Sequence, residues 1–254
     1  MKVYFYTTKG VDKAESEDRI LVGQDVFSET EACVDLTFGN VAIADGVGGN
    51  LGGSVAAQFV CEQLAQLFQP KETDLSAINK ALIEKSSQDN TLSGMATTMS
   101  GIWFDENGTA FIYHVGNTRV YAIQAQQYLN QLTADDTVVA FLVRTGRLSE
   151  EEAEDYPAKN EITACFGGGK ASLLNASFIP LDTEAHRQLL FTCDGVHDIL
   201  TVDDIEDIVS AADGNWAKAV HDLVSSAKGA GSTDDCSAAI VDLDYINQDG
   251  KDKR

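Results

Sequence analysis

Residues Val41 to Gly49 have the sequence Val-Ala-Ile-Ala-Asp-Gly-Val-Gly-Gly. The apolar run predicts a buried strand, and Asp45 follows at its end, just before a cluster of glycines. Apolar residues at helical spacing then predict a helix over 54–68. A carboxylate between a strand end and glycine is not a typical solvated position, because the strand fixes the side chain and glycine lets a ligand approach the backbone. This stretch therefore predicts a core strand with a candidate binding residue at its end.

Three other places in the chain also have acidic residues directly before or after a predicted strand. Asp194 follows an apolar strand and precedes Gly195, while the pairs Glu17-Asp18 and Asp234-Asp235 stand just before predicted strands. A single Asp-Gly step is most often only a turn. If all four places meet at one sheet edge, however, their mutual repulsion requires cations, and oxygen ligands select Mg²⁺, Mn²⁺ or Ca²⁺. Two such ions sharing a carboxylate would suit hydrolysis of a phosphate ester.

Hydrophobic periodicity along the rest of the chain favours an α+β fold. We expect strands at 3–8, 19–26, 34–43, 97–104, 110–115, 119–123, 171–178, 188–192 and 238–243. We expect helices at 54–68, 75–85, 137–144, 149–155, 202–211 and 216–227. Strands in antiparallel runs and helices in pairs fit a four-layer α-β-β-α sandwich, with two antiparallel sheets flanked by helices. Residues 1–246 would form a single domain, followed by a polar tail at 247–254.

Composition excludes several classes of function. The 254 residues contain 18 Lys and Arg against 40 Asp and Glu, a net charge of −22, which repels nucleic acids and anionic membranes. The five cysteines are odd in number and lack Cys-x-x-Cys spacing, which favours reduced thiols over disulfides or a zinc site. The N-terminus is too polar for a signal peptide, and no apolar run approaches the roughly 20 residues of a membrane span. We therefore expect a cytoplasmic protein that binds neither nucleic acid nor membrane.

Ordered motifs between about Thr8 and Asp242 resemble one known family. The segments and the family patterns that they match are Lys9–Arg19 (ending in N-E-D), Ala44–Gly49 (D-G-x-G-G), Gly94–Thr98 (G-x-x-T-T), His114–Tyr121 (H-V-G-D-S-R-x-Y), Leu132–Asp136 (L-T-x-D-H), Asn160–Gly167 (N-x-I-T and x-G), Cys193–Asp198 (S-D-G-x-x-D) and Ser232–Ser237 (D-N-x-[ST]). The chain thus resembles the metal-dependent serine/threonine protein phosphatases of type 2C, the PPM family, in their compact bacterial form.

The resemblance implies two Mn²⁺ or Mg²⁺ ions at one end of a β-sandwich. Asp45 would bridge the ions, with Asp194 and Asp234 completing one site and Glu17 and the Gly46 carbonyl serving the other. Asp18 would hydrogen-bond a water on the metals. A metal-activated water would attack phosphorus directly, so none of the cysteines is expected to act as a nucleophile.

Two departures from the family pattern concern the expected site residues. Lys13 stands where the family usually has a phosphate-binding Arg; it would bind phosphate as a point charge. A surface lysine is the less favoured alternative. Asn117 replaces an Asp that, together with the residue matching Asp198, helps to hold a third ion in bacterial relatives. Because an amide oxygen brings no charge, we expect a third site at Asp198 and Asn117 to be weak or absent.

The segment 133–169 corresponds to the family's mobile flap beside the active site. It is rich in acidic residues around Glu150, Glu151 and Glu152. These residues could form a solvated helix face, or they could favour basic phosphopeptides over acidic ones.

The resemblance favours an enzyme that dephosphorylates phosphoserine and phosphothreonine in proteins. Such an enzyme would oppose a cognate serine/threonine kinase and would act as a monomer. A regulatory pseudophosphatase that binds phosphoproteins with little turnover is the alternative, which Asn117 and Lys13 favour and the complete set of acids disfavours. A calcium-binding module is a poor alternative, since no D-x-[DN]-x-[DN]-G loop is present.

Overall fold

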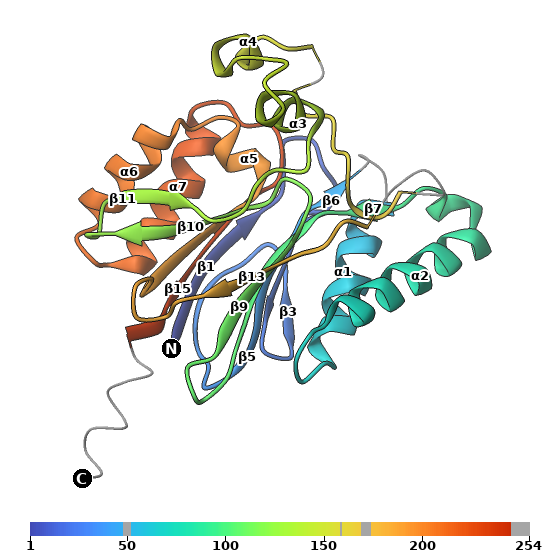
Figure 1. The fold of residues 1–254 in the computed structure, drawn as a ribbon, viewed down its shortest axis with the longest axis horizontal. Coiled ribbons are helices and arrows are strands. Elements are labelled where there is room, and N and C mark those ends of the chain that lie inside the picture. Colours follow the sequence, from blue (N-terminus) through green and yellow to red (C-terminus); the bar gives the residue numbers. More distant parts are fainter. Residues whose placement is uncertain (48–51, 158, 169–173, 245–254) are drawn as a thin grey trace.

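Two six-stranded antiparallel sheets lie face to face in a computed structural model that describes residues 1–47, 52–157, 159–168 and 174–244 (Figure 1). In spatial order, the first sheet contains β11 (Tyr128–Gln131), β10 (Arg119–Gln124), β14 (Gln188–Thr192), β15 (Cys236–Asp242), β1 (Lys2–Thr8) and β4 (Glu31–Asp35). The second contains β13 (Ser177–Leu181), β9 (Ala110–Val115), β8 (Met99–Phe104), β5 (Gly39–Ala44), β2 (Arg19–Val22) and β3 (Asp25–Phe27). A small third sheet joins β12 (Phe166–Gly167), β7 (Ala96–Thr97) and β6 (Gly46–Val47).

Helices cover the outer faces of both large sheets. The helices α1 (Gly52–Ala65) and α2 (Glu72–Gln88) lie against the second sheet, while α6 (Val202–Ala211) and α7 (Trp216–Gly229) lie against the first (Figure 1). The short α5 (Asp194–His197) begins directly after β14, and a 3₁₀ turn (Asn90–Leu92) follows α2. The predicted four-layer α-β-β-α sandwich is therefore confirmed.

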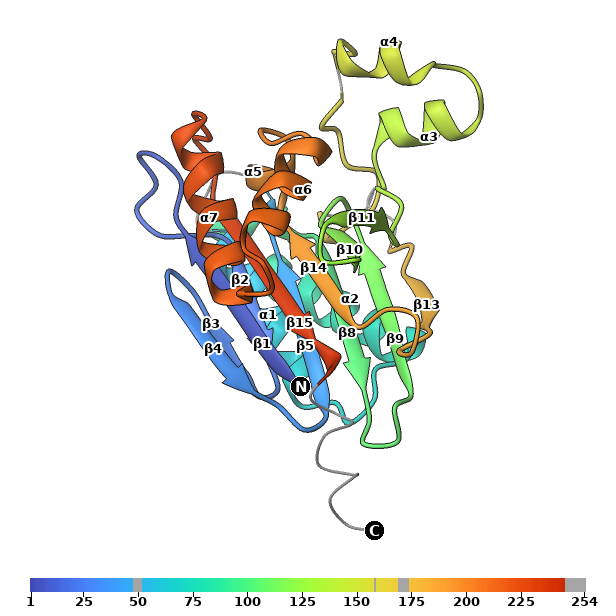
Figure 2. The ribbon, with the colours of Figure 1, turned by 90° about the vertical axis from the view of Figure 1, so that its left-hand side faces the viewer.

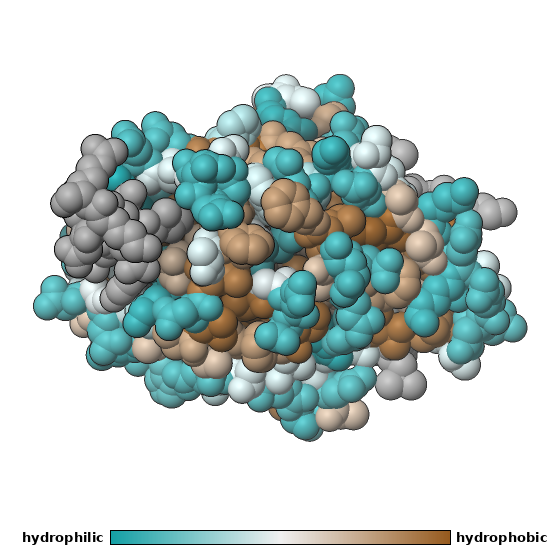
Figure 3. Space-filling model, turned by 90° about the horizontal axis from the view of Figure 1, so that it is seen from below, coloured by the Kyte–Doolittle hydropathy of each residue, from teal (hydrophilic) through white to brown (hydrophobic). Residues whose placement is uncertain are grey.

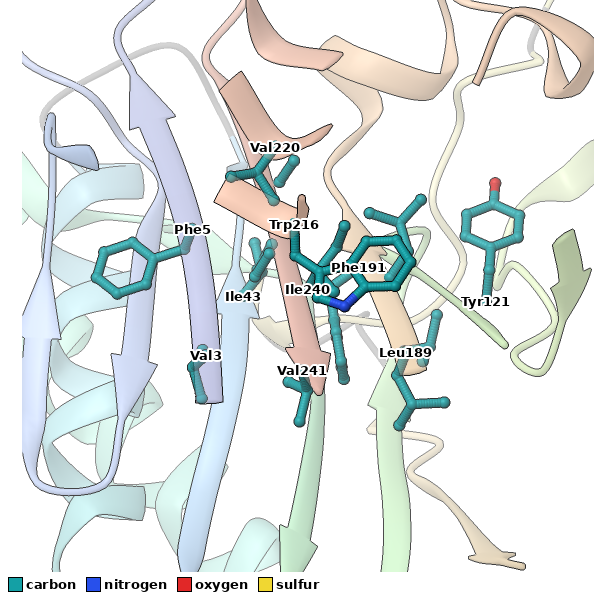
Figure 4. Close-up of a cluster of buried hydrophobic side chains, with 14 of the residues drawn as sticks. Val3, Phe5, Ile43, Tyr121, Leu189, Phe191, Trp216, Val220, Ile240 and Val241 are labelled. Carbon is teal, nitrogen blue, oxygen red and sulfur yellow. The ribbon is translucent and has the colours of Figure 1, made fainter. Parts of the chain in front are cut away.

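Alternation along the strands builds the core. Val3, Phe5 and Thr7 of β1 are buried, whereas the residues between them are only half-buried. One apolar cluster fills the space between the sheets and continues beneath α7, where Trp216 is buried; Figure 4 shows part of it, with side chains from β1, β14, β15 and α7. A second cluster lies between the second sheet and α1 and α2. β15 is central and buried along its whole length, as expected for a strand covered on both faces.

Several predicted strands have different limits in the structure. The expected strand 34–43 is two strands, β4 and β5, which belong to different sheets, and Gly39 at the start of β5 has a φ of 127°. The expected strand 19–26 is the β2–β3 hairpin, which turns at Gly23 with a φ of 65°. The strand expected at 171–178 is β13 at Ser177–Leu181, on a sheet edge. Residues 171–173, Gly48, Gly49 and the tail 247–254 lie outside the described residues.

The remaining sequence-based expectations concern thiols and membranes. The cysteines form no disulfide, as expected; Cys33 is exposed, Cys165 is half-buried, and the others are buried. Within the described ranges, no helix combines the length and apolar character that a membrane crossing needs. The lower end of the molecule in Figure 1 carries apolar residues among polar ones (Figure 3). Phe38 and Phe68, next to β5 and α1, are both exposed.

Candidate active site

The strand register brings four acidic segments to one end of the sandwich. Asp45 follows β5, and Asp18 precedes β2, which pairs with β5 through Arg19 and Ala44. Asp194 follows β14, and Asp234 precedes β15, which pairs with β14 through Thr192 and Ala238. In an antiparallel pair the end of one strand lies beside the start of the next, so each sheet contributes two of the four segments to the same end.

Ser237 connects the acids of the two sheets. Its hydroxyl donates to Oδ2 of Asp18 at 2.6 Å, and the Thr7 hydroxyl lies 2.8 Å from the same oxygen of Ser237. Asp18 and Asp45 each offer a carboxylate oxygen, and Cys193 its sulfur, within 4.8 Å of one another. The backbone of Asp45 is fixed as well, because its carbonyl accepts hydrogen bonds from the Thr97 hydroxyl and the Thr98 N–H, both at 2.8 Å.

A second group of acids surrounds the ammonium of Lys13. Nζ lies 2.7 Å from Oδ1 of Asp234, 2.9 Å from Oδ2 of Asp235 and 3.2 Å from Oε2 of Glu17. Asp235 is buried, and its carboxylate also accepts the backbone N–H groups of Gly10 at 2.6 Å and Glu17 at 2.8 Å. The predicted metal ligands Glu17 and Asp234 thus share one cation of the protein itself.

Two glycines allow the segments of the site to approach closely. A Cβ added at Gly195 would lie 1.9 Å from the carbonyl oxygen of Asp235, and one added at Gly46 would lie 2.6 Å from the backbone of Gly53. Neither distance is possible for a real side chain. Gly46 therefore packs the Asp45 segment against the start of α1, and Gly195 packs α5 against the segment before β15.

The two residues expected at a third ion lie next to this cluster. Nδ2 of Asn117 donates to Oδ2 of Asp194 at 3.1 Å. Asn117 and Asp198 both line a cavity of about 630 Å³, whose wall also includes Arg119, Lys159 and His197. The structure therefore brings together all the acids predicted from the sequence, with the third-site pair at the edge of the cluster.

Burial and mutual repulsion make the charged form of these carboxylates unfavourable. Burial, followed by the charge of Asp235, raises the pKa of Asp18 to about 7. Loss of hydration, together with Asp194 and Asp18, raises the pKa of Asp45 well above its usual range. Burial also raises the pKa of Asp194 and of Glu17, in the latter case against the opposing effect of Lys13. A positive charge placed among these groups would relieve the penalty.

The donor atoms of the cluster fit a hard divalent cation. Among the described residues, Oε1 of Glu17, Oδ1 of Asp18 and Oδ1 of Asn117 are buried and have no hydrogen-bond partner. Burial raises the pKa of the Cys193 thiol well above its ordinary value, so this sulfur stays protonated and is a poor metal ligand. The available ligands are therefore oxygens, which suit Mg²⁺, Mn²⁺ or Ca²⁺.

Comparison with known proteins identifies the family. A family model described as "Protein phosphatase 2C" matches residues 16–234, which is most of the chain and includes every predicted metal ligand. The chain belongs to the protein phosphatase 2C family.

Individual relatives of this phosphatase are distant in sequence but similar over most of its length. Protein phosphatase PhpP of Streptococcus pneumoniae is 29% identical over 216 residues, covering 80% of this chain and 85% of its own. The crystal structure of the serine/threonine phosphatase PstP/Ppp of Mycobacterium tuberculosis is 26% identical, with a TM-score of 0.77 over 96% of this chain and 99% of that chain. A structure of the PstP catalytic domain in complex with two manganese ions matches with a TM-score of 0.71, at 26% identity and with 95% and 99% coverage.

Family membership confirms the resemblance and the class of reaction expected from the sequence. The chain is a metal-dependent protein phosphatase, a phosphoric monoester hydrolase that acts on phosphoproteins.

Local sequence patterns assign no role to several contacts of this phosphatase site. Asp235 stands out in the sequence only as the neighbour of Asp234, yet its buried carboxylate fixes Gly10, Glu17 and Lys13. Ser237 belongs to a matched motif without a role of its own, although it holds Asp18. Two adjacent acids before a buried strand are the one available signal for Asp235, because a buried second acid requires a partner of its own.

The acidic flap of the phosphatase projects beyond the sandwich (Figures 1 and 2). It contains α3 (Val138–Arg144) and α4 (Glu150–Glu154), and a bridge between Thr137 and Ile162 closes its base. Glu150, Glu151 and Glu152 are exposed, and Glu152 forms a capping box with Ser149 at the start of α4. At least Glu152 therefore has a structural reason for its charge, while Glu150 also lines the cavity beside Asp198.

Proposed function

We propose that this phosphatase hydrolyses phosphoserine and phosphothreonine in proteins with the help of two divalent ions, Mn²⁺ or Mg²⁺. One observation carries the proposal: acids from four separate segments lie at one end of the sandwich, where Oε1 of Glu17 and Oδ1 of Asp18 are buried without a hydrogen-bond partner among the described residues. The names of the relatives support the substrate class, because PstP is called a serine/threonine phosphatase. Since a protein phosphatase needs phosphorylated substrates, a serine/threonine kinase must act before it, and we propose that the two enzymes oppose each other.

Each predicted ligand has a place in this proposal. Asp45 would be shared by the two ions, Asp194 and Asp234 would complete one site, and Glu17 with the carbonyl of Gly46 would serve the other. The ions would supply an activated water and would neutralise charge on the phosphoryl oxygens.

The residues around the ligands orient the reacting groups. The Ser237 hydroxyl holds Oδ2 of Asp18, which leaves Oδ1 of Asp18 to accept a hydrogen bond or a proton. The hydrogen bonds from Thr97 and Thr98 fix the Asp45 carbonyl, and the pairing of Gly46 with Thr97 fixes the backbone that follows it. Such preorganisation keeps reorganisation of the site small during the reaction. We further propose that Asn117, which is neutral and already bonded to Asp194, makes a third ion weak or absent beside Asp198.

Hydrolysis of p-nitrophenyl phosphate and of a phosphothreonine peptide tests the proposal. We expect turnover with Mn²⁺, loss of turnover with a chelator, and recovery when Mn²⁺ is restored. Asp45→Asn removes the charge at the centre and should lower kcat/KM by about two orders of magnitude or more, since metal-assisted charge stabilisation is worth several kcal/mol. Thermal unfolding of the variant would show that it remains folded.

The outcome also separates the two functions that the sequence left open. If the wild-type protein binds Mn²⁺ but hydrolyses no phosphopeptide, the enzyme proposal fails and the chain is a pseudophosphatase. If it hydrolyses a phosphotyrosine peptide faster than its phosphothreonine counterpart, the proposed substrate class is wrong.

A further inference from the structure

The ammonium of Lys13 contacts three carboxylates at the proposed metal centre. It lies 2.7 Å from Asp234, 2.9 Å from Asp235 and 3.2 Å from Glu17. Two of these residues, Glu17 and Asp234, are proposed ligands of different ions. Lys13 is therefore a cation within the cluster that the divalent ions are proposed to occupy.

The three carboxylates differ in how firmly they are held. Asp235 is only 3% exposed and is fixed by the N–H groups of Gly10 and Glu17, whereas the side chain of Asp234 is 56% exposed. The flexible four-carbon stem of lysine lets its compact charge move over several ångströms. Lys13 can therefore leave the exposed Asp234 and the edge of Glu17 while it keeps the buried Asp235 as its partner.

Lys13 and a divalent ion compete for the same oxygens. A cation bound by Glu17 or Asp234 would lie within a few ångströms of the ammonium, where two like charges repel each other by several kcal/mol at the effective dielectric constant of a protein surface. In the metal-free protein, by contrast, the ammonium reduces the repulsion among the three carboxylates that it contacts. The residue thus stabilises one state of the site at the expense of the other.

Lys13 and Asp235 form a pair of opposite charges that the fold brings together. Their side chains lie 2.9 Å apart although the two residues are 222 positions apart in the sequence. Asp235 adds a buried charge that needs a counter-ion, and Lys13 supplies it.

We propose that Lys13 is a tethered counter-ion, anchored by Asp235, which holds the metal-free carboxylates together and must move away from Glu17 and Asp234 when divalent ions bind. Its displacement raises the metal concentration at which the phosphatase becomes loaded. This role rests on the proposed metal centre, and it differs from the phosphate-binding role that the sequence suggested for Lys13.

Calorimetric titration of the chelator-treated full chain with Mn²⁺ tests the role directly. Lys13→Gln keeps a hydrogen-bond donor for Asp235 but removes the charge. We expect its Kd for Mn²⁺ to fall by about tenfold, because a tenfold change corresponds to only part of the repulsion between the ammonium and the ion. We also expect its metal-free Tm to fall by several degrees. The matched control is Lys9→Gln in the same segment, whose ammonium bonds only to the Ala14 carbonyl in the described structure; its Kd and Tm should stay unchanged.

The results distinguish the counter-ion role from its alternatives. Equal Mn²⁺ affinity in the wild type and Lys13→Gln overturns the counter-ion role alone, and if the KM for phosphopeptide also rises, Lys13 binds phosphate instead. If neither protein binds Mn²⁺, the proposed function falls and this inference falls with it. Should Lys13→Gln fail to fold, nitrogen NMR of the lysine ammonium groups in the wild type provides the test. The Lys13 signal, assigned with Lys13→Arg, must shift as Mg²⁺ is added, and an unmoved signal overturns the inference.

Discussion

At the scale of single residues, the carboxylates of the candidate site repel one another, and a few hydrogen-bond partners hold them in place. Ser237 holds one oxygen of Asp18, Asn117 donates to Asp194, and Asp235 accepts two backbone N–H groups. Each of these contacts gives a buried carboxylate a hydrogen-bond donor, which compensates in part for lost hydration. Exchanging a neutral partner for a charged one should therefore change the stability of the metal-free protein and that of the metal-bound protein in opposite directions.

Asn117→Asp is the clearest case. The change replaces an amide donor 3.1 Å from Asp194 with a carboxylate, so we expect the metal-free Tm to fall by a few degrees because like charges repel. With Mn²⁺ present, Tm should recover, and an additional ion should bind beside Asp198. Melting curves in chelator and in Mn²⁺, together with Mn²⁺ stoichiometry, provide the measurement. Asn130→Asp on the exposed face of β11 is the control; equal behaviour of the two variants would contradict the idea.

The sequence predicts the acids of the site better than it predicts their partners. Asp45 and Asp194 stand out because strand ends beside glycine are recognisable from local sequence alone. Ser237, which holds Asp18, and two of the three partners of Lys13, Asp234 and Asp235, lie more than 200 positions away in the chain. Local patterns contain no information about such pairs. For this reason the sequence alone predicts that Lys13 binds phosphate, whereas in the structure its ammonium lies among carboxylates.

At the scale of elements, the site depends on how closely α5 approaches the segment before β15. Gly195→Ala would place a methyl group 1.9 Å from the Asp235 carbonyl oxygen, so α5 must move and carry Asp194 away from Asp234. We expect a loss of roughly 1–3 kcal/mol of stability. We also expect a fall of about 100-fold in kcat/KM, because small displacements of catalytic groups have large effects on rate. Urea unfolding and phosphopeptide kinetics measure the two quantities.

A second glycine in a helix serves as the control for this substitution. Gly229 ends α7, and the space that a Cβ would occupy there is open. Gly229→Ala should leave kcat/KM unchanged and should not lower stability, since alanine loses less backbone entropy on folding. If Gly195→Ala behaves in the same way, the close approach of α5 is not required for activity.

Prediction of the elements succeeds where periodicity has clear ends. The amphipathic patterns at 202–211 and 216–227 correspond closely to α6 and α7. The strand at 34–43 is wrong because apolar residues continue through the turn at Leu36, Thr37 and Phe38, so the pattern does not reveal that the chain crosses from one sheet to the other. The two-residue strands β6, β7 and β12 escape prediction because they are too short to show any period.

At the scale of the whole molecule, the net charge of −22 is concentrated in part at the site, where two divalent ions would reduce it to −18. The raised pKa of Asp18, about 7 against an ordinary 3.8, means that the folded metal-free protein binds this proton more tightly than the unfolded chain does. The contribution of Asp18 to stability is therefore largest below pH 4 and is lost as pH rises toward 7, at up to about 1.4 kcal/mol per pH unit for each proton.

Metal-free protein should consequently melt at a higher temperature at pH 5.5 than at pH 8. With saturating Mn²⁺ the trend should reverse, because protons and metal compete for the same carboxylates. Melting curves in chelator and in Mn²⁺ across this range provide the measurement, and Asp45→Asn should weaken the difference between the two series. A metal-free Tm that falls on acidification from pH 8 to 5.5 would contradict this account.

The place of β15 in the first sheet also has a consequence for synthesis of the chain. β14 and β1 are joined only through β15, and β15 follows every other strand of the described chain. On the ribosome, β1 and β4 must therefore wait for residues 236–242 before the sheet can close, and non-local pairing of this kind folds late. Asp234 emerges just before the same strand. A nascent chain that lacks β15 thus has no finished sandwich, and activity can begin only after residues 236–242 have been translated.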